Sequence, residues 1–298
     1  MDQRFTIRFK ATEEGQLLRE ALAQYGISKR ALTAIKFDGG EITVNGNEQN
    51  VRYKLMQDDE VMVKFPIEPI SDSLIAETHE HLPIVYEDDA LLIINKPAYM
   101  STIPSREHPS GSVANYLRGY YNQHGIASTI HIVTRLDRNT SGLMVIAKHR
   151  HIHHLMSEQQ KRGEIHREYE AIVHGHVREP FRSIIAPIGR KETSIIEREV
   201  REGGQYAHTD MTVLKRITKD NVDMTHVRLK LYTGRTHQIR VHAAHIGHPL
   251  VGDELYGGLR DLMDRQALHC VSVTFYHPIL QKQMNFLSAL PEEMNKLI

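Results

Sequence analysis

A polar stretch at residues 66–82 divides the chain into two folding units, and this division limits its architecture more than any single motif does. The stretch carries four acidic residues, no lysine or arginine, and prolines at its margins. Such a composition is typical of a linker. A chain of 298 residues is long enough for about two domains of ~150 residues. The sequence therefore predicts a small unit at 1–65, a linker at 66–82 and a larger unit at 83–298.

The first unit has the pattern of a small α/β domain. Apolar residues at 17–22 share one helical face, and Ser28 is suited to cap a second short helix. Strands are expected at 42–44 and 61–63, and Asn45-Gly46 between them predicts a tight turn.

The second unit has more strand pattern than helix pattern. Strands are predicted near 91–94, 143–147, 169–174, 211–214, 226–232 and 271–276, and helices near 111–121, 150–161 and 236–246. Because these elements do not alternate strictly, we expect an α+β domain around a mostly antiparallel or mixed central sheet.

The charge distribution allows a nucleic-acid partner without establishing one. The formal net charge is zero, yet residues 101–298 hold 26 Lys/Arg against 20 Asp/Glu, together with 18 of the 20 histidines. A neutral protein can carry a basic groove, although a surplus of this size is also common on ordinary surfaces.

Other features predict where the protein works. Its one cysteine, Cys270, excludes an internal disulfide framework and is typical of a reducing cytosol. No stretch approaches the ~18 consecutive apolar residues of a membrane span, and the first ten residues lack the apolar core of a signal peptide. We therefore expect a cytoplasmic protein without a membrane association.

The densest chemical signal surrounds Asp137, which stands between two arginines at the end of an expected strand. Positive charge on both sides favours the ionised form of such an acid. For three residues alone, an Arg–Asp pair at a surface β-turn is the favoured interpretation.

The whole segment 131–148 is more specific. It resembles the second motif of the RluA/RluD family of pseudouridine synthases, in which Arg-Leu-Asp-x-x-Thr-Ser-Gly surrounds the catalytic aspartate. Further motifs of that family are matched in order by Tyr86–Asp89 with Asn95–Pro97, by Arg167–Tyr169, by Thr233–His242, and by Gly247–Pro249 with Gly252, Asp253 and Tyr256. The resemblance covers about residues 83–280 and implies the pseudouridine synthase fold.

The resemblance also implies a mechanism. The reaction breaks the N-glycosidic bond of a uridine, turns the uracil and joins its carbon 5 to the ribose. No redox step or external group is involved, so no cofactor is expected. Asp137 would act at the anomeric centre, either as a nucleophile or by removing the 2′ proton.

Two partners of Asp137 follow from the same motifs. Tyr169 would stack under the uracil and take the proton from carbon 5; judged alone, it would be a core tyrosine of its strand. Arg240 would form an ion pair with Asp137 and hold it ionised.

The substrate RNA imposes further expectations. A uridine in folded RNA must be extruded from its stack, and by the resemblance Arg135 would fill the gap that it leaves. We assign additional RNA contacts to Lys96, Arg138, Arg235 and His237. Thr134 stands where many family members have histidine, so the RNA target cannot be carried over from those members.

The first unit contributes a second resemblance. The stretch from Ser28-Lys29-Arg30 through residues 42–46 to 59–61 resembles the alpha-L RNA-binding domain of small ribosomal subunit protein four. It implies an RNA-docking module with Lys29 and Arg30 at its RNA face. By analogy, such a module favours ribosomal RNA over transfer RNA as the partner. No obligatory protein partner is inferred.

Two rival interpretations remain open. Histidines gather at 151–154 and 237–248. His149 and His153 have the i, i+4 spacing of zinc ligands on a helix, but the sequence lacks the His-Glu of a zinc motif, His237 and His242 are five apart, and no cysteine pair is available, so we expect no metal. The other rival is a non-catalytic RNA-binding protein, against which the complete set of Asp137, Tyr169 and Arg240 argues.

Overall fold

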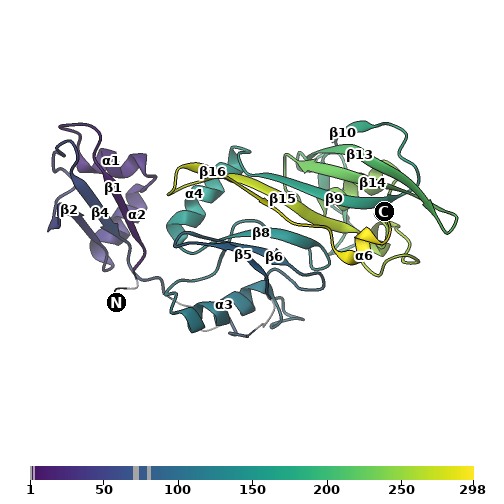
Figure 1. Cartoon of the computed structure of the whole chain (residues 1–298), viewed down its shortest axis with the longest axis horizontal. Helices are drawn as coiled ribbons and strands as arrows, with labels where there is room; N and C mark the ends of the chain where they lie inside the picture. Colours follow the sequence, from purple (N-terminus) through teal and green to yellow (C-terminus); the bar gives the residue numbers. More distant parts are fainter. Residues whose placement is uncertain (1, 3, 70–73, 79–81) are drawn as a thin grey trace.

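The structure is a computed structural model that describes residue 2 and residues 4–69, 74–78 and 82–298. Two bodies are joined end to end in Figure 1: a small N-terminal body, and a longer one built on a large twisted sheet. The predicted α+β class with a mixed sheet is confirmed. Residues 70–73 and 79–81 of the predicted linker lie outside the described residues.

The N-terminal body is a four-stranded antiparallel sheet covered by two helices. Its elements are β1 (Thr6–Lys10), α1 (Leu18–Gln24), α2 (Lys29–Phe37), β2 (Glu41–Val44), β3 (Asn47–Glu48) and β4 (Glu60–Lys64), with strand order β1-β4-β2-β3. Ser28 caps α2 by accepting a hydrogen bond from the Ala31 amide at 3.2 Å. Asn45 and Gly46 both have positive φ, as a tight hairpin turn requires. The sequence pattern did not indicate β1, which pairs with β4 along its whole length.

The larger body is organised by a ten-stranded sheet. Its strands are β5 (Ile84–Glu87), β6 (Leu91–Lys96), β7 (His131–Ile132), β8 (Ser141–Ala147), β9 (His166–His174), β10 (Phe181–Ile185), β13 (His208–Lys219), β14 (Val222–Leu231), β15 (Leu268–His277) and β16 (Lys282–Leu287). The main path runs β10-β13-β14-β9-β15-β8-β6-β5, while β16 pairs with β15 and β7 with β8. Every pairing within this sheet is antiparallel except the parallel contact of β15 with β8.

Shorter elements complete this body. They are α3 (Val113–His124), α4 (Arg150–Lys161), the hairpin β11 (Ile188–Arg190) and β12 (Arg198–Val200), α5 (Gln238–His245), a 3-10 turn (Glu254–Tyr256) and α6 (Glu292–Asn295). The seven residues of β8 are all buried, because β8 is a central strand covered on both faces. Its apolar neighbours from β6, β9 and β15 form one continuous core with it.

The parallel contact between β8 and β15 depends on Gly142. This glycine pairs with Cys270 and has φ +115°. A Cβ atom on residue 142 would lie 2.5 Å from the backbone nitrogen of Cys270, which no side chain tolerates. The absence of a side chain therefore lets the two strands meet where β8 begins, directly after the Asp137 loop.

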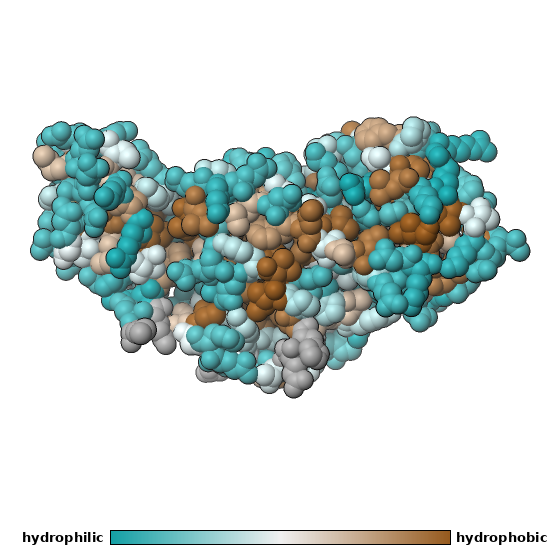
Figure 2. Space-filling model, in the orientation of Figure 1, coloured by the Kyte–Doolittle hydropathy of each residue, from teal (hydrophilic) through white to brown (hydrophobic). Residues whose placement is uncertain are grey.

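The two bodies touch through aromatic rings. Phe5 stacks on His149 with ring centroids 4.8 Å apart, and Phe65 stacks on His151 at the same separation. Glu68, from the predicted linker, is buried and accepts a hydrogen bond from the Arg150 amide at 2.6 Å. Beside these contacts a groove with about 1790 Å³ of empty space runs between α2 and the start of α4, and Figure 2 shows the notch between the two bodies.

Candidate active site

Asp137 lies in the turn between β7 and β8, at the mouth of a cavity. The turn is closed by a hydrogen bond from the Thr140 amide to the Asp137 carbonyl at 3.1 Å. Thr134, at the other end of the same loop, accepts a hydrogen bond from the Val145 amide at 2.9 Å. These bonds fix the loop to the start of β8, so the backbone of Asp137 has a defined position.

One guanidinium connects two carboxylates at this site. Arg240 Nη1 donates to Asp137 Oδ2 at 3.2 Å, while its Nε and Nη2 donate to the two oxygens of Asp253 at 2.7 Å each. Asp253 is fully buried, whereas the side chain of Asp137 is 28% exposed. Burial alone would lower the pKa of Arg240, but the hydrogen bonds and charges of the two aspartates outweigh it and raise the pKa. Arg240 is therefore a fixed cation facing Asp137.

His237 lies on the other side of the same carboxylate. It caps α5 in the left-handed region with φ +57°, and its Nε2 is 3.8 Å from Asp137 Oδ2. Its Nδ1 is 2.8 Å from the Tyr256 hydroxyl, which itself accepts a hydrogen bond from the Arg198 amide at 3.0 Å. We assign the tyrosine proton to the bond with Nδ1, which leaves Nε2 as the protonated nitrogen. Burial lowers the pKa of His237 despite the charge of Asp137, so this imidazole is neutral.

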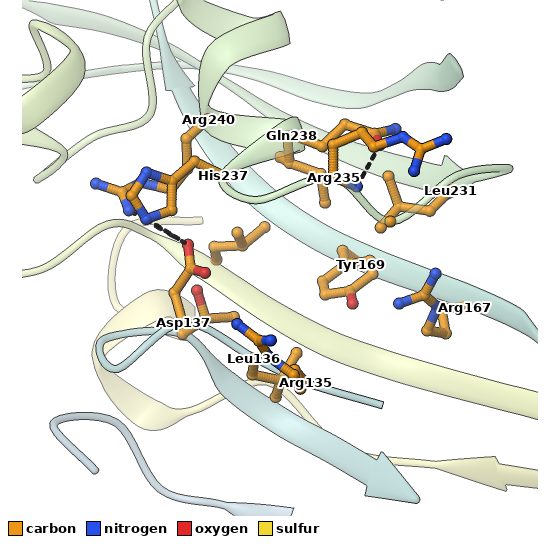
Figure 3. A pocket seen from close by; sticks show the side chains of 14 residues that line it. Arg135, Leu136, Asp137, Arg167, Tyr169, Leu231, Arg235, His237, Gln238 and Arg240 are labelled. Carbon is orange, nitrogen blue, oxygen red and sulfur yellow. Dashed lines mark hydrogen bonds and ion pairs between the residues drawn. The ribbon is translucent and has the colours of Figure 1, made fainter. Parts of the chain in front are cut away.

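Tyr169 forms a wall of the cavity. It is only 4% exposed, and it pairs with Leu229 of β14 and Cys270 of β15. Burial raises the pKa of Tyr169 well above its ordinary value, so its phenol is protonated at neutral pH. In Figure 3 its ring lies between Asp137 on one side and Arg167 on the other.

The cavity is shaped to hold a flat ring beside a charged edge. It has about 430 Å³ of empty space that opens to solvent. Its apolar lining consists of Leu136, Tyr169, Leu231, Ile239 and Leu268. Arg167 also lines it, is 7% exposed, and its Nε has no hydrogen-bond partner among the described residues. A cationic group at the edge of an apolar slot gives orientation to a polar ligand.

The structure gathers most of the side chains that the sequence selected. Asp137, Tyr169 and Arg240 line one cavity, although Arg240 and Asp137 are 103 positions apart in the chain. Arg135 and Arg235 are exposed at its rim, and His237 lies inside it. Arg138 is exposed nearby and donates to the Tyr99 carbonyl at 3.3 Å.

Lys29 and Arg30 lie elsewhere. Both are exposed at the first turn of α2 in the N-terminal body, and Arg30 lines the groove between the two bodies. They are not part of the cavity at Asp137.

The RNA contact predicted for Lys96 is wrong. Lys96 is completely buried, and its ammonium group donates to the carbonyls of Pro97, Met100 and Arg138 at 2.8, 2.9 and 3.1 Å. Burial lowers its pKa to about 7, although the charge of Asp137 opposes this shift. Its hydrogen bond to the Arg138 carbonyl instead supports the loop that carries Asp137.

Sequence reasoning gave no role to Asp253 and Tyr256, which the structure places around Arg240. Asp253 fixes the guanidinium by two hydrogen bonds, and the Tyr256 ring lies under it with its centroid 4.9 Å from the guanidinium carbon. The available signal was their place in the third motif, directly after the segment that carries Arg240.

The described part of the chain contains no group of three His, Cys, Asp or Glu side chains placed to hold a metal ion. The histidines that suggested one have other contacts: His153 bonds the Ile132 carbonyl, and His242 bonds Thr209 and the Ala186 carbonyl. Within the same described ranges, no helix has the length and apolar character needed to cross a bilayer.

Comparison with known proteins agrees with this geometry. The family model for RNA pseudouridylate synthase matches residues 90–245, which include Asp137, Tyr169 and Arg240. The chain is 50% identical over 281 residues to the uncharacterized RNA pseudouridine synthase YjbO of Bacillus subtilis, covering 94% of this chain and 98% of that protein. It is 38% identical to ribosomal large subunit pseudouridine synthase D of Yersinia pestis, with 95% and 90% covered, and 35% identical to the Escherichia coli protein of that name, with 100% and 95% covered.

The solved structures give the same result. Human RNA pseudouridylate synthase domain containing 1 superimposes with a TM-score of 0.59 at 26% identity, over 70% of this chain and 84% of its own. The chain therefore belongs to the RNA pseudouridylate synthase family, as the sequence motifs predicted. It is an RNA pseudouridine synthase, an isomerase that acts on uridine in RNA.

Proposed function

We propose that this enzyme modifies uridine in large-subunit ribosomal RNA and that Asp137 is its catalytic carboxylate. Two relatives named ribosomal large subunit pseudouridine synthase D support this substrate, because they align with nearly the whole chain at 35% and 38% identity. The single observation that carries the catalytic assignment is the ion pair of Asp137 with Arg240 at the mouth of the cavity walled by Tyr169. Transfer RNA is the alternative substrate.

The chemistry requires an ionised carboxylate that still has an oxygen to use. Arg240 and His237 both approach Oδ2 of Asp137, and Oδ1 accepts no hydrogen bond from any described residue. Oδ1 is thus free to attack the anomeric carbon as the glycosidic bond breaks, or to remove the 2′ proton. In the first route the bond between Oδ1 and the anomeric carbon breaks as carbon 5 of the turned uracil bonds to that carbon, and in the second route the 2′ proton returns to the ribose. In both routes carbon 5 loses its proton and the freed N1 gains one, so the product is an isomer of uridine.

Tyr169 is proposed to act on the uracil itself. Its ring is fixed by the strands on both sides and offers a flat surface for stacking. Because its phenol is protonated at neutral pH, it can accept the carbon 5 proton only after losing its own proton to another group in the complex. Arg167, whose Nε is unpaired among the described residues, faces the same space and favours such a negative charge.

Capture of the RNA is assigned to the exposed basic groups. Arg135, Arg138 and Arg235 stand at or near the mouth of the cavity, where a flipped nucleotide would enter. The N-terminal body, with Lys29 and Arg30 at the start of α2, is proposed to dock on a distant part of the same RNA. The cytoplasm, where ribosomal RNA is found, is the proposed location.

Tritium release from RNA labelled at carbon 5 of uridine tests this function. The native protein is expected to release tritium from large-subunit ribosomal RNA, and Asp137→Asn is expected to release none. Asp264→Asn, which changes an acid whose side chain is 83% exposed, is the matched control and should behave as native. Release by Asp137→Asn would overturn the mechanism, release from transfer RNA alone would overturn the substrate, and release from no RNA would favour a binding protein.

A further inference from the structure

A second hollow lies beside the active-site cavity and shares Arg235 with it. It has about 670 Å³ of empty space and is lined by the arginine side chains at 190, 198 and 235 together with the backbone around Gly203-Gly204; we call it the arginine pocket. We propose that the arginine pocket binds a phosphodiester of the RNA strand next to the target uridine. This inference rests on the proposed RNA-modifying function and names a binding site for its substrate.

The three arginines carry charge that no acid neutralises. Arg190 donates to the Ile195 carbonyl at 3.1 Å, Arg198 to the Ile196 carbonyl at 3.0 Å, and Arg235 to the Tyr206 carbonyl at 2.9 Å. None of the three forms an ion pair with a carboxylate of the described residues. Carbonyl bonds fix a guanidinium without cancelling its charge, so the remaining N–H groups favour an anion.

Other basic side chains of the β11–β12 hairpin do form ion pairs with acids. Arg201 pairs with Glu192 at 3.0 Å, and Lys191 pairs with Glu197 at 3.1 Å. The surplus of positive charge is thus confined to the side chains that line the arginine pocket. A random basic surface would not separate paired from unpaired groups in this way.

The backbone of the pocket permits close approach. Gly203 has φ +76° and no side chain toward the opening, and a Cβ atom on Gly204 would lie 2.7 Å from the Ile188 carbonyl carbon. The chain can turn this tightly only with glycine, and the turn leaves one wall without side chains. Phosphate groups are typically bound where backbone and arginine N–H groups converge on such an open wall.

The arginine pocket is rigidly tied to the catalytic site. The Arg198 amide donates to the Tyr256 hydroxyl, which contacts His237, which in turn lies beside Asp137. The hairpin also packs on α5 through a small apolar cluster of Ile188, Ala207 and Val241. An anion in the pocket would therefore be held at a constant distance from the catalytic carboxylate.

The position of Arg235 indicates which class of ligand would occupy the arginine pocket. It borders both spaces, and Figure 3 shows its side chain reaching away from Asp137, toward the outer side of the cavity. A ligand that fills both spaces must carry a base beside an anion, which is the repeating pattern of a nucleic-acid strand. Phosphate contacts of this kind fix the register of the strand and carry no sequence information of their own.

Binding and kinetic measurements on paired variants test the proposal. Arg190→Gln and Arg198→Gln are combined in one protein. These substitutions change only side chains, so the Arg198 backbone amide that donates to the Tyr256 hydroxyl is kept. RNA binding is measured in the Asp137→Asn background, with the RNA in which mapping locates the modified uridine. The double change is expected to weaken binding about tenfold and to reduce the slope of log affinity against log salt by about 0.7, the loss of one phosphate contact. When the double arginine change is made in the protein that retains Asp137, KM should rise while kcat stays within about twofold of the native value.

Arg182→Gln is the matched control, because this exposed arginine of β10 already pairs with Glu179 at 3.6 Å. A second arm replaces single phosphates next to the target uridine with uncharged methylphosphonates. One such replacement should weaken binding to the protein with both arginines, but not to the double variant.

The proposal would be overturned if the double arginine change and the methylphosphonate replacement had additive effects on binding, or if the salt slope of the double variant were unchanged. Failure of the proposed function is distinguishable, because it would appear as no tritium release by the native protein whatever the salt slope.

Discussion

Arg240 binds Asp253 more closely than it binds Asp137. Two hydrogen bonds of 2.7 Å join the guanidinium to Asp253, and one of 3.2 Å joins it to Asp137. Asp253 therefore fixes the orientation of Arg240, and Asp137 meets a cation that is already in place. Such prior orientation of a charged group lowers the reorganisation needed during the reaction.

Asp253→Asn is expected to lower kcat about 100-fold, because Arg240 would lose its orientation and a misplacement of ~1 Å costs about this much. It should also lower the free energy of unfolding by about 3 kcal/mol, since it breaks a buried ion pair. Tritium release and urea denaturation check the two effects. Native kcat in a folded variant would show that Asp253 does not position Arg240.

Tyr169→Phe separates stacking from proton transfer. Phenylalanine keeps the ring in the same buried slot, so the fold and RNA affinity should be unchanged within about twofold. If the phenol oxygen takes the carbon 5 proton, tritium release falls by about 100-fold or more. RNA binding and tritium release are measured on the same preparation. Retention of most of the release would assign Tyr169 to stacking alone.

Lys96→Met tests the assignment of Lys96 to the support of the Asp137 loop. Three carbonyls would lose their donor, so the free energy of unfolding should fall by about 3 kcal/mol. We expect kcat to fall because the Asp137 loop loses its support, and RNA binding to weaken only together with this loss of stability, since Arg135 and Arg138 lie in the same loop. Exposed Arg138→Met is the comparison, since it should weaken RNA binding without loss of stability. A Lys96→Met protein with native stability and native kcat but weaker RNA affinity would restore Lys96 as an RNA contact.

The contact between the two bodies is expected to depend on pH. Burial lowers the pKa of His149 and of His151 to about 4, although Glu68 opposes the shift of His149. In the unfolded chain each imidazole has its ordinary pKa near 6.5, so below that pH the unfolded state binds more protons than the folded state. Stability should therefore fall as the pH is lowered from about 6.5 to 4, by up to ~3 kcal/mol for each group.

Urea denaturation at pH 7 and pH 5, followed by circular dichroism, measures this loss. His151→Phe keeps a ring against Phe65 but cannot titrate, so it should lose a part of the pH dependence, while His149 and other buried histidines such as His269 keep the rest. The exposed His124→Gln is the control and should retain the native profile. A native protein equally stable at both pH values would contradict the assignment of neutral imidazoles to this contact.

Local patterns in the sequence predicted what local physics determines. The cap at Ser28, the turn at Asn45-Gly46 and the buried strand β8 all depend on residues close in the chain. The family motifs selected Asp137, Tyr169 and Arg240, which the fold brings to one cavity.

Contacts between distant segments could not be predicted in this way. Lys96 looked like a surface cation, because its three carbonyl acceptors come together only in the folded loop. The arginine pocket combines Arg190 and Arg198 of a hairpin with Arg235 from another loop, and nothing in their spacing indicates that they meet. The burial of Glu68, in a stretch with the composition of a linker, likewise depends on His131 and Arg150.

The position of β15 determines when this enzyme can first become active. Within the sheet as described, β15 alone bridges the group β5–β8, which carries Asp137, and the group β9–β14, which carries Tyr169. Residues 268–277 follow both groups in the chain, so a nascent chain that has not yet reached them holds the two halves of the proposed catalytic site without the strand that joins them. A newly made molecule is therefore expected to modify RNA only after β15 has been synthesised, and a chain that terminates before β15 is expected to be inert rather than unselective.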